Sequence, residues 1–578
     1  MLRYPVVSST IQHGPAHGSE AGAVASARPD AVGTAHREAP RWDRTDAMAI
    51  LLAAIVLVIF RLHAFGLPLE NDECNYAYMG KRLLEGDRLY IDLWDHQPPG
   101  VFVLFAVVIR LFGDAPTVFR MLALAASLAS LAAIYGIART TAGRTAAFAA
   151  AALFAFVSSD PGTGGEGCNR ETFMNALILA AWLVVLSWRE SPWKAWLLAG
   201  ALLGIASALK TVVAVHWMLL AGWLLAQACR NGPRSRRRES LMVLIFFSVG
   251  PIAVWAGTSM YFAATGRWNE FVDAVFAFNL GYGGEEMTLI DRFASFFKPF
   301  GHPFKFESAF PLWIAAIPAS IWLTAEAIRR RSAERLALLL LLLAGFSAVC
   351  LPGRFWPHYY YLMVPACVVA VSVTVGDIVR LLHLPISSLI RGGRSRRFVP
   401  GILVLLALPA LVFVSEARHY LLQPPFGITV KRYNSRDFWA RAQGENVARV
   451  TGSGNKVFVF GNEASIYYYS GRRCASRYTM VTGLSAGMRG ADQRRRTLIE
   501  ELERDPPRLI VVLFNEPPFP EWRDFLTRHY GEPAGWDYHD RTREPIMFVL
   551  ARKDQPIEPL DWDWDRASVG GWQLGERP

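Results

Sequence analysis

The sequence predicts a polytopic α-helical membrane protein with a small α/β domain at its C-terminal end. Three observations carry this prediction. Of the 578 residues, 52% are hydrophobic and 19% are charged; the mean hydropathy is +0.23; and the apolar residues gather in runs long enough to cross a bilayer. The 35 Phe and 19 Trp fit this class, because aromatic side chains fill apolar cores and anchor at membrane surfaces.

The apolar runs place the membrane-spanning part in residues 46–415. Residues 1–45 are rich in Ala, Gly, His, Pro and Ser without an apolar period, so we expect a disordered tail there. A transmembrane helix needs about 20 residues, which gives about eleven spans. Their predicted positions are 46–65, 118–138, 145–159, 172–188, 194–209, 211–228, 240–262, 309–328, 336–352, 358–376 and 398–415.

Basic loops set the predicted orientation. The loops "CRNGPRSRRRES", "IRRRSAER" and "IRGGRSRRF" are rich in Arg, and such short loops stay in the cytoplasm. Counting spans outward puts the N-terminus in the cytoplasm of a cell inner or plasma membrane, and residues 66–117 and 416–578 outside. The short apolar run at 98–113 contains Arg110 and is predicted to lie in the outer interface. This distribution explains the net charge of +11, so a nucleic-acid partner is not expected.

Residues 416–578 have a different pattern. The β-branched runs "NKVFVFG", "PPRLIVVLF" and "PIMFVLARK" alternate with the helical patterns "EASIYYYSG" and "DQRRRTLIEELER". Alternating strands and helices predict a small extracytoplasmic α/β domain. The six Cys have no zinc-binding spacing, and a disulfide between Cys74 and Cys168 stays open because both are predicted to lie outside.

An acidic pair follows the first predicted span, in "LENDECNYAYMGKRLLEGD". Asp72 and Glu73 would lie at the depth of the bilayer surface, where a carboxylate can take a proton from an incoming hydroxyl or amine. The alternative is structural, because acidic residues also favour the first turn of a helix. The pattern alone leaves both interpretations open.

Other polar residues are predicted at the same membrane face. His96 and Gln97 precede two prolines that stiffen "YIDLWDHQPPG". Three further turns carry Glu171 in "GGEGCNRETFMNALIL", Lys210 in "SALKTVVAVHW", and Arg354 and His358 in "PGRFWPHYYYLMVP". Taken singly, each residue could instead have a structural role, as a solvated loop residue, a snorkelling lysine or a hydrogen-bonded cap. Together, these carboxylates and cations predict a site that binds an anionic lipid headgroup and performs acid–base chemistry.

These motifs resemble the GT-C glycosyltransferases of the protein O-mannosyltransferase and aminoarabinose transferase superfamily. The resemblance covers about residues 46–555 and rests on four segments in the expected order. They are the Asp-Glu segment with its "HQPPG…LFG" continuation, "GCNRETFMNALILAAWL", "GRFWPHYYYLMVPA" and "FVFGNEASIYYYSGRRCASRY". The resemblance implies an integral-membrane enzyme that moves a sugar from a polyprenyl-phosphate donor to a lipid, glycan or protein acceptor on the external face.

The resemblance also implies roles for individual residues. Asp72 would be the base, with inversion at the anomeric carbon and Glu73 beside it; Glu171 would position the acceptor or a cation. Lys210, Arg354 and His358 would contact the lipid phosphate. Gln97 stands where relatives often have Lys, so His96 or Lys210 would supply that contact. A divalent metal bound by Asp72 and Glu171 stays open as a cofactor.

Two other functions share part of this pattern. A polysaccharide polymerase or ligase would use the same membrane chemistry and would differ chiefly in its acceptor groove. A transporter or flippase of lipid-linked sugars would place charges or broken helices near the bilayer midplane. The ionisable groups here are predicted at one face instead, which favours the transferase.

Overall fold

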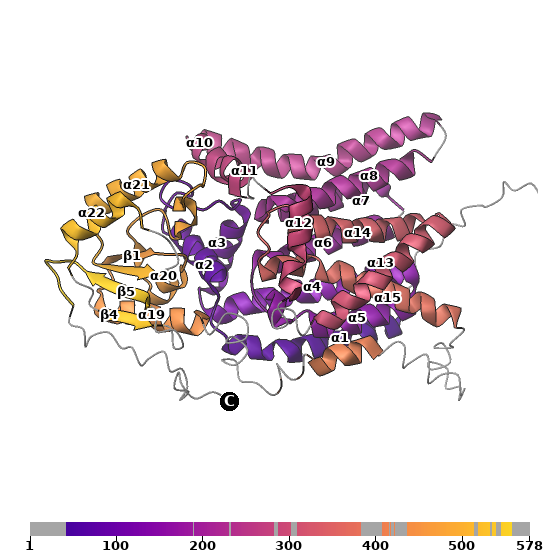
Figure 1. Ribbon diagram of the computed structural model, residues 1–578. Helices are drawn as coiled ribbons and strands as arrows, with labels where there is room; N and C mark the ends of the chain where they lie inside the picture. Colours follow the sequence, from indigo (N-terminus) through magenta and orange to yellow (C-terminus); the bar gives the residue numbers. More distant parts are fainter. Residues whose placement is uncertain are drawn as a thin grey trace, which may run out of the picture. The chain divides into compact units, whose positions relative to one another are not determined.

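The computed structural model describes residues 42–557, except 189, 231–232, 283–286, 302–308, 383–406, 416, 418–420, 422–435, 514–517, 532–534 and 539–544. Within these residues nine helices are long and apolar enough to cross a membrane (Figure 1). They are α1 (Arg44–Arg61, continued by the 3-10 helix η1, Leu62–Gly66), α4 (Pro116–Ala142), α6 (Arg170–Ser187), α7 (Pro192–Leu209), α8 (Ala214–Ala228), α9 (Pro233–Ala264), α13 (Phe310–Arg330), α14 (Ala333–Cys350) and α15 (Val364–Leu381). The predicted polytopic helical fold is confirmed.

Three of the predicted spans need comment. The segment 145–159 forms α5 (Arg144–Val157), which has 14 residues and is shorter than a full span. The segment 398–415 lies partly outside the described residues. The predicted helix start at 358 is wrong: residues Pro357–Leu362 form a 3-10 helix, η6, and α15 begins at Val364. Pro365 explains the late start, because proline lacks an N–H and is favoured in the first turn of a helix.

Apolar side chains on the outer helices face away from the protein. Ile314, Ile317 and Ile321 on α13 are exposed, as are Leu244 and Ile252 on α9. A row of exposed Ile and Leu on long helices is stable where lipid, rather than water, surrounds it. The membrane-spanning assignment therefore rests on exposure as well as on hydropathy.

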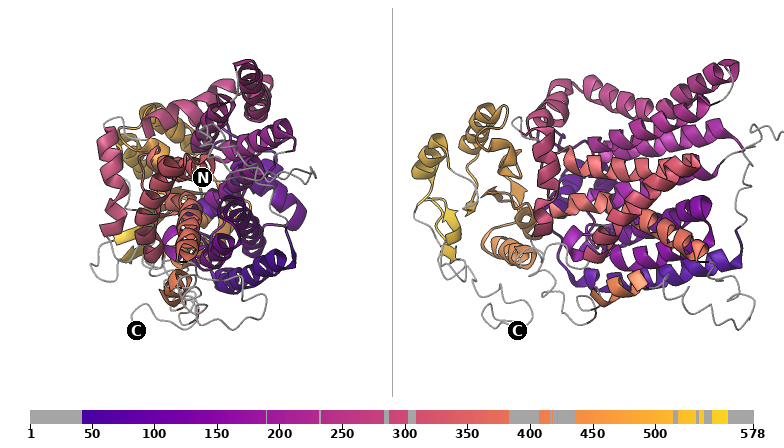
Figure 2. Two further views of the ribbon diagram at one scale, coloured as in Figure 1. Left: turned by 90° about the vertical axis from the view of Figure 1, so that its right-hand side faces the viewer. Right: turned by 45° about the vertical axis from the view of Figure 1, so that its right-hand side comes forward.

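Small residues bring α7 and α9 into close contact. In Figure 2, α7, α8 and α9 run alongside one another. A Cβ added to Gly200 of α7 would lie against the backbone of Phe247, and one added to Gly250 of α9 would lie against the backbone of Ala201. The two glycines let the helix backbones approach, which is how helices pack in a bilayer without a hydrophobic driving force.

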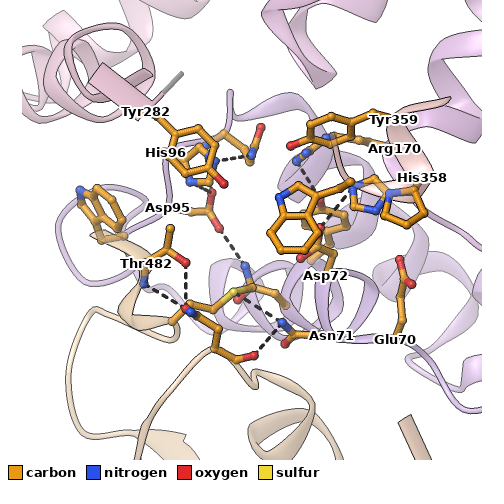
Figure 3. A pocket seen from close by; sticks show the side chains of 18 of the residues that line it. Glu70, Asn71, Asp72, Asp95, His96, Arg170, Tyr282, His358, Tyr359 and Thr482 are labelled. Carbon is orange, nitrogen blue, oxygen red and sulfur yellow. Dashed lines mark hydrogen bonds and ion pairs between the residues drawn. The ribbon is translucent and has the colours of Figure 1, made fainter. Parts of the chain in front are cut away.

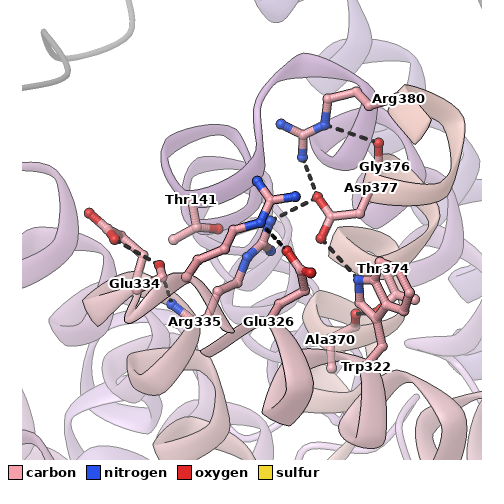
Figure 4. Close-up of polar contacts among 12 residues, drawn as sticks. Thr141, Trp322, Glu326, Glu334, Arg335, Ala370, Thr374, Gly376, Asp377 and Arg380 are labelled. Carbon is pink, nitrogen blue, oxygen red and sulfur yellow. Dashed lines mark hydrogen bonds and ion pairs between the residues drawn. The ribbon is translucent and has the colours of Figure 1, made fainter. Parts of the chain in front are cut away.

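One end of the helices is held by arginine–carboxylate pairs. Asp46 of α1 accepts from Arg139 at 2.9 Å and from Arg144 at 3.0 Å, across the turn between α4 and α5. Asp377 of α15 accepts from Arg335 of α14 at 2.8 Å and from Arg380 (Figure 4). We call this the basic end. The opposite end carries the turns that hold the candidate residues.

Two helices lie in the first predicted external loop. They are α2 (Asn71–Leu84), which directly follows η1, and α3 (Gly100–Phe112), which begins after Pro99 and ends at Gly113 with φ of 86°. Gly80 of α2 sits against the backbone of α3 at Phe105 and Ala106, so the two helices pack closely.

Another helical stretch follows α9 in the sequence. It runs from α10 (Trp268–Val272) through one π-helical turn to α11 (Phe278–Tyr282).

The C-terminal region contains a five-stranded sheet. Its strands are β1 (Lys456–Phe460), β2 (Arg473–Cys474), β3 (Leu509–Leu513), β4 (Gly535–Tyr538) and β5 (Pro545–Ala551), in the order β2-β1-β3-β5-β4. β1 pairs in parallel with β2 and β3, whereas β5 is antiparallel to β3 and β4. Helices α19 (Arg436–Val450), α20 (Ser465–Ser470), α21 (Ala491–Arg504) and α22 (Pro520–His529) accompany it. β2 and β4 were too short to show a strand period in the sequence.

We predict that Gly250→Ala lowers the apparent melting temperature of the detergent-solubilised protein. The added methyl group would press α9 against the backbone of α7, and such overpacking costs about 1–3 kcal/mol. Gly257→Ala is the matched control, because it lies in the same helix with nothing within 4 Å of its added Cβ. Equal melting of the two variants would contradict the close α7–α9 contact.

Candidate functional site

Glu73 fixes the start of α2 from inside the protein. Its carboxylate accepts from the Arg120 guanidinium of α4 at 3.1 Å, from the Cys168 backbone N–H at 2.5 Å and from the Glu70 backbone N–H at 3.0 Å. The side chain is fully buried. Glu73 is therefore occupied by structural contacts, and it does not line the cavity described next.

Asp72, one residue earlier, faces a cavity of about 290 Å³ at the end of the helices opposite the basic end (Figure 3). Its side chain is 32% exposed. The cavity is lined from α2 and the residue before it by Glu70, Asn71, Asp72, Asn75 and Tyr76; from the following loop by Trp94, Asp95, His96 and Gln97; from α6 by Arg170; and from later turns by Tyr282, Trp356, Pro357, His358 and Tyr359. Asp437, Asn462, Met480 and Thr482 of the C-terminal region complete it.

Cations form the wall of the cavity at the head of α6. Arg170 donates to the Tyr76 hydroxyl at 2.7 Å and to Glu171 at 3.3 Å. Lys210, at the turn between α7 and α8, donates to the same Glu171 oxygen at 2.9 Å, and its ammonium lies 3.3 Å from the centre of the Tyr359 ring. Burial lowers the pKa of Lys210 to about 7, against the pull of Glu171, and a bound anion would favour its charged form. With Arg170 and Lys210 both charged and sharing one carboxylate, one positive charge is left for an anionic ligand.

His358 stands between the cations and Asp72. Its Nε2 lies 3.9 Å from Oδ2 of Asp72. Burial, opposed by Glu171 and Asp72 and reinforced by Lys210 and Arg170, lowers the pKa of His358 to about 4. At neutral pH the ring is therefore uncharged and can donate one hydrogen bond without adding charge.

A second wall is built on Asp95. Its Oδ1 accepts from the Gln97 backbone N–H at 2.9 Å, and its Oδ2 accepts from the Asn75 side chain at 2.8 Å. The Gln97 amide nitrogen lies 2.7 Å from Nε2 of His96. Burial raises the pKa of Asp95 to about 6, whereas burial lowers the pKa of His96 to about 3. This wall is therefore polar and carries no cation.

Arg354 lies just behind the cavity, against Tyr282. Its guanidinium donates to the Tyr282 carbonyl at 3.1 Å and stacks 4.7 Å from the centre of that ring. The Tyr282 ring also contacts His96, and the two ring centres lie 4.8 Å apart. Arg354 thus holds Tyr282 in place. Tyr282 lines the cavity, whereas Arg354 does not.

The C-terminal region closes the cavity on the side of Asn71. The Asn71 side chain donates to the Asn462 carbonyl at 3.0 Å and accepts from the Ala464 backbone N–H at 2.7 Å. The Asn462 side chain accepts from Thr482 N–H at 3.0 Å and from its hydroxyl at 2.8 Å. The bonds of Asn71 join residues almost 400 positions apart in the sequence.

The structure brings most of the predicted residues together. Asp72, His96, Gln97 and His358 line the cavity, while Glu171, Lys210 and Arg354 stand directly behind lining residues. Glu73 is the predicted residue that points elsewhere. Sequence reasoning missed Arg170, Asp95 and the C-terminal lining residues as members of the site. Arg170 and Asp95 lay beside residues that were chosen, so adjacency to Glu171 and His96 was the available signal.

The residues present do not fit a divalent cation. Among the described residues no three His, Cys, Asp or Glu side chains come together as a metal site. Glu171, the predicted partner of Asp72 in metal binding, is already held by Arg170 and Lys210. Two cations against a carboxylate repel a third, so Glu171 does not suit a metal ion as a ligand. The described cysteines, Cys74 and Cys168 included, are free thiols, so the disulfide left open from the sequence is not formed.

Known proteins share this architecture. A family model for dolichyl-phosphate-mannose-protein mannosyltransferases matches residues 96–255. ArnT from Cupriavidus metallidurans in the apo state has a TM-score of 0.57 at 14% identity, covering 88% of this chain and 98% of its own. The family model covers only part of the chain, and the structural likeness shows that the chain has the GT-C fold. The fold implied by the sequence motifs is thereby confirmed.

Two further GT-C structures agree. ArnT bound to undecaprenyl phosphate has a TM-score of 0.55 at 14% identity and covers 87% of this chain and 98% of its own. Archaeal oligosaccharyltransferase AglB from Archaeoglobus fulgidus, in complex with an inhibitory peptide and a dolichol-phosphate, has a TM-score of 0.55 at 12% identity. The match covers 89% of this chain and 75% of the AglB chain. At these identities the structures share the GT-C fold. No curated protein matches the chain by sequence.

The contrast between the adjacent carboxylates gives a prediction. Glu73→Ala leaves the Arg120 guanidinium buried without its carboxylate, which costs about 3–5 kcal/mol, so we expect a large drop in melting temperature and in the yield of monodisperse protein. Asp72→Asn removes no such pair and is expected to purify like the wild type. If Glu73→Ala melts like the wild type, Glu73 does not hold α2 in place.

Proposed function

We propose that this GT-C protein transfers a sugar from a polyprenyl-phosphate carrier to an acceptor on the extracytoplasmic face of the membrane. The observation that carries the proposal is the cavity, where one partly exposed carboxylate, Asp72, faces a group of buried cations. A base opposite an anion site is what transfer from a sugar phosphate requires. The carrier class is supported by the neighbour structures, which contain undecaprenyl phosphate and dolichol-phosphate.

The distribution of charge supports the orientation. The arginines of the basic end lie in short turns between spans, and such turns stay in the cytoplasm. The cavity is at the other end, so we assign it to the outer face, with the C-terminal sheet on the same side. We place the N-terminus in the cytoplasm and the protein in the inner or plasma membrane. A lipid carrier keeps its tail in the bilayer, and the cavity at the ends of the helices lies where its headgroup would emerge.

We propose a single-displacement reaction. Asp72 takes the proton of the acceptor hydroxyl or amine as the acceptor atom bonds to the anomeric carbon of the sugar. The bond between that carbon and the phosphate oxygen breaks at the same time, and its electron pair stays on the phosphate. Attack from the face opposite the leaving phosphate inverts the anomeric configuration.

The cations stabilise the leaving group. Arg170 lines the cavity, and Lys210 stands behind it on the shared carboxylate of Glu171. Negative charge grows on the phosphate as the glycosidic bond breaks, and fixed cations in a site shielded from water stabilise that charge strongly. Arg170 joins the phosphate-binding set, whereas Lys210, Glu171 and Arg354 hold its members in position. Glu73 is left out of the catalytic set.

The acceptor side of the cavity is proposed to be the wall that contains Asn71, Asn462 and Thr482. Amides and hydroxyls there bind hydroxyl or amide groups without demanding a charge. Lipid, glycan and protein acceptors all offer such groups. A polysaccharide polymerase or ligase would use the same wall for a growing chain, and product analysis separates that case from single transfer.

We predict that Asp72→Asn reduces sugar transfer at least about 100-fold, because the amide cannot take up the proton. The measurement is transfer by purified protein in nanodiscs, supplied with polyprenyl-phosphate sugars and membrane extract as the acceptor source. Asp92→Asn is the matched control: it lies in the same loop, and its partner is the exposed Arg88. Near wild-type transfer by Asp72→Asn would refute its role as the base.

Lys210→Ala and His358→Ala are expected to weaken donor use more than acceptor use. Lys210→Ala removes a positive charge behind the phosphate site, and His358→Ala removes a hydrogen-bond donor beside it. Either loss raises the donor KM about tenfold or more and changes the acceptor KM less. Steady-state kinetics with each substrate varied makes the comparison. Lys194→Ala, a change to an exposed residue at the start of α7, serves as the control. Equal changes in both KM values would indicate that these residues are structural.

A further inference from the structure

A segment of the C-terminal region reaches the loop that carries His96 and Gln97. The Trp94 backbone N–H donates to the Arg477 carbonyl at 2.9 Å, which makes a parallel bridge between Trp94 and Tyr478. The Trp94 ring packs at right angles on Phe278, with ring centres 5.2 Å apart, and against Tyr478 at 5.6 Å. A backbone hydrogen bond and ring packing thus join the loop to a segment nearly 400 residues later in the sequence.

A chain of buried hydrogen bonds runs from this segment to the cavity. The Thr479 hydroxyl donates to Oδ1 of Asn75 at 2.8 Å, Nδ2 of Asn75 donates to Oδ2 of Asp95 at 2.8 Å, and Oδ1 of Asp95 accepts from the Gln97 N–H at 2.9 Å. Thr479 is 1% exposed and Asn75 is fully buried. Asp95, Gln97 and Asn75 line the cavity, whereas Thr479 does not.

The donors and acceptors in this series of hydrogen bonds fix the orientation of the Asn75 side-chain amide. Asn75 has one oxygen and one nitrogen at the end of its side chain, and the Thr479 hydroxyl selects the orientation in which the nitrogen faces Asp95. Without that hydroxyl the Asn75 oxygen is buried without a donor, and a rotated amide would turn its oxygen toward the Asp95 carboxylate. Either outcome weakens the contact that holds Asp95, and an unpaired buried polar atom is costly.

Asp95 in turn sets the geometry of two cavity residues. Its bond to the Gln97 N–H closes the turn over residues 95–97, and its Oδ1 lies 3.5 Å from Nδ1 of His96. The charged groups facing Asp95 are Arg170, which favours its ionised form, and Asp72, which opposes it. Because Asp72 disfavours the ionised form of Asp95, the Asp95 carboxylate depends on its two hydrogen-bond donors to stay in place.

We propose that Thr479 is a positioning residue for the donor site: acting through Asn75 and Asp95, it orients His96 and Gln97 on the cavity wall. This inference rests on the proposed function and extends it: the phosphate, held by Arg170, is also contacted by the uncharged hydrogen-bond donors of His96 and Gln97. The C-terminal segment therefore takes part in donor binding without touching the donor. A merely structural role for Thr479 would leave the affinity of the folded protein for the carrier unchanged.

The test uses the full-length protein in nanodiscs, with undecaprenyl phosphate as the probe and its affinity measured by titration. Thr479→Val removes the hydroxyl at nearly constant volume, and Thr479→Ala serves if valine disturbs folding. We expect either variant to bind the probe about tenfold more weakly, because one buried hydrogen bond is removed and His96 and Gln97 are misplaced as a result. Thr479→Ser keeps the hydroxyl and is expected to stay within about twofold of the wild type.

Thr527→Val is the matched control, because Thr527 lies on α22 of the same sheet region and its hydroxyl bonds within its own helix to the Arg523 carbonyl. Equal affinity in the wild type, Thr479→Val and Thr479→Ala would overturn the proposal. So would an equal decrease in Thr527→Val, which would mark a general weakening of the sheet region.

Hydrogen–deuterium exchange at the Gln97 amide, measured without the probe, tests the chain of hydrogen bonds separately. We expect faster exchange in Thr479→Val and wild-type exchange in Thr479→Ser, and unchanged exchange in both would overturn the proposal. If the wild type fails to bind undecaprenyl phosphate while the exchange result holds, the proposed carrier is wrong and the positioning of Gln97 by Thr479 stands.

Discussion

The buried carboxylate of Glu73 is the contact on which the rest of the site depends. It ties the first turn of α2 to Arg120 of α4 and to the backbone just before α6, so three separate parts of the helical region meet at one side chain. Because Glu73 points inward, the residue before it must point to another side of the helix. The position of Asp72, the proposed base, therefore follows from the structural position of its neighbour.

Electrostatics then divides the cavity into two walls. Arg170 and Lys210 share Glu171 on one wall, and their surplus charge suits a phosphate. On the other wall, burial keeps His96 neutral and Asp95 is held by neutral donors. His358, uncharged for the same reason, lies between Asp72 and the cations. It so separates the proposed base from charges that would lower its basicity. The arrangement fits a base and a leaving phosphate on opposite sides of one sugar.

Much of this fold was predictable, because the bilayer imposes a simple rule on sequence. Runs of about 20 apolar residues must become helices, and arginine-rich turns indicate which ends lie together. The same rule placed Asp72, Lys210 and His358 at one end. It could not separate Asp72 from Glu73, since their roles depend on Arg120, which lies 47 residues away in the sequence. It also missed the start of α15, where Pro365 outweighs an apolar run.

The C-terminal contribution was beyond the reach of pattern reasoning. Strand periodicity predicted the sheet, but Asn462 and Thr479 sit in irregular segments and Thr482 in a four-residue 3-10 helix, all too short or irregular to show a period. Their importance comes from contacts with Asn71 and Asn75, which only the folded chain brings near. Arg170 was not selected for a different reason: its place in the site depends on its contact with the Tyr76 hydroxyl, which no sequence pattern indicates.

The central claim is that a carrier phosphate binds beside Arg170 and His358, across the cavity from Asp72, at the end of the helices away from the arginine pairs. A cryo-electron microscopy structure of the protein in nanodiscs with undecaprenyl phosphate tests this directly. The account predicts phosphate density in the cavity, within hydrogen-bonding distance of the Arg170 guanidinium and faced by Asp72. Phosphate density at the basic end, beside Arg335 and Arg380, would contradict it.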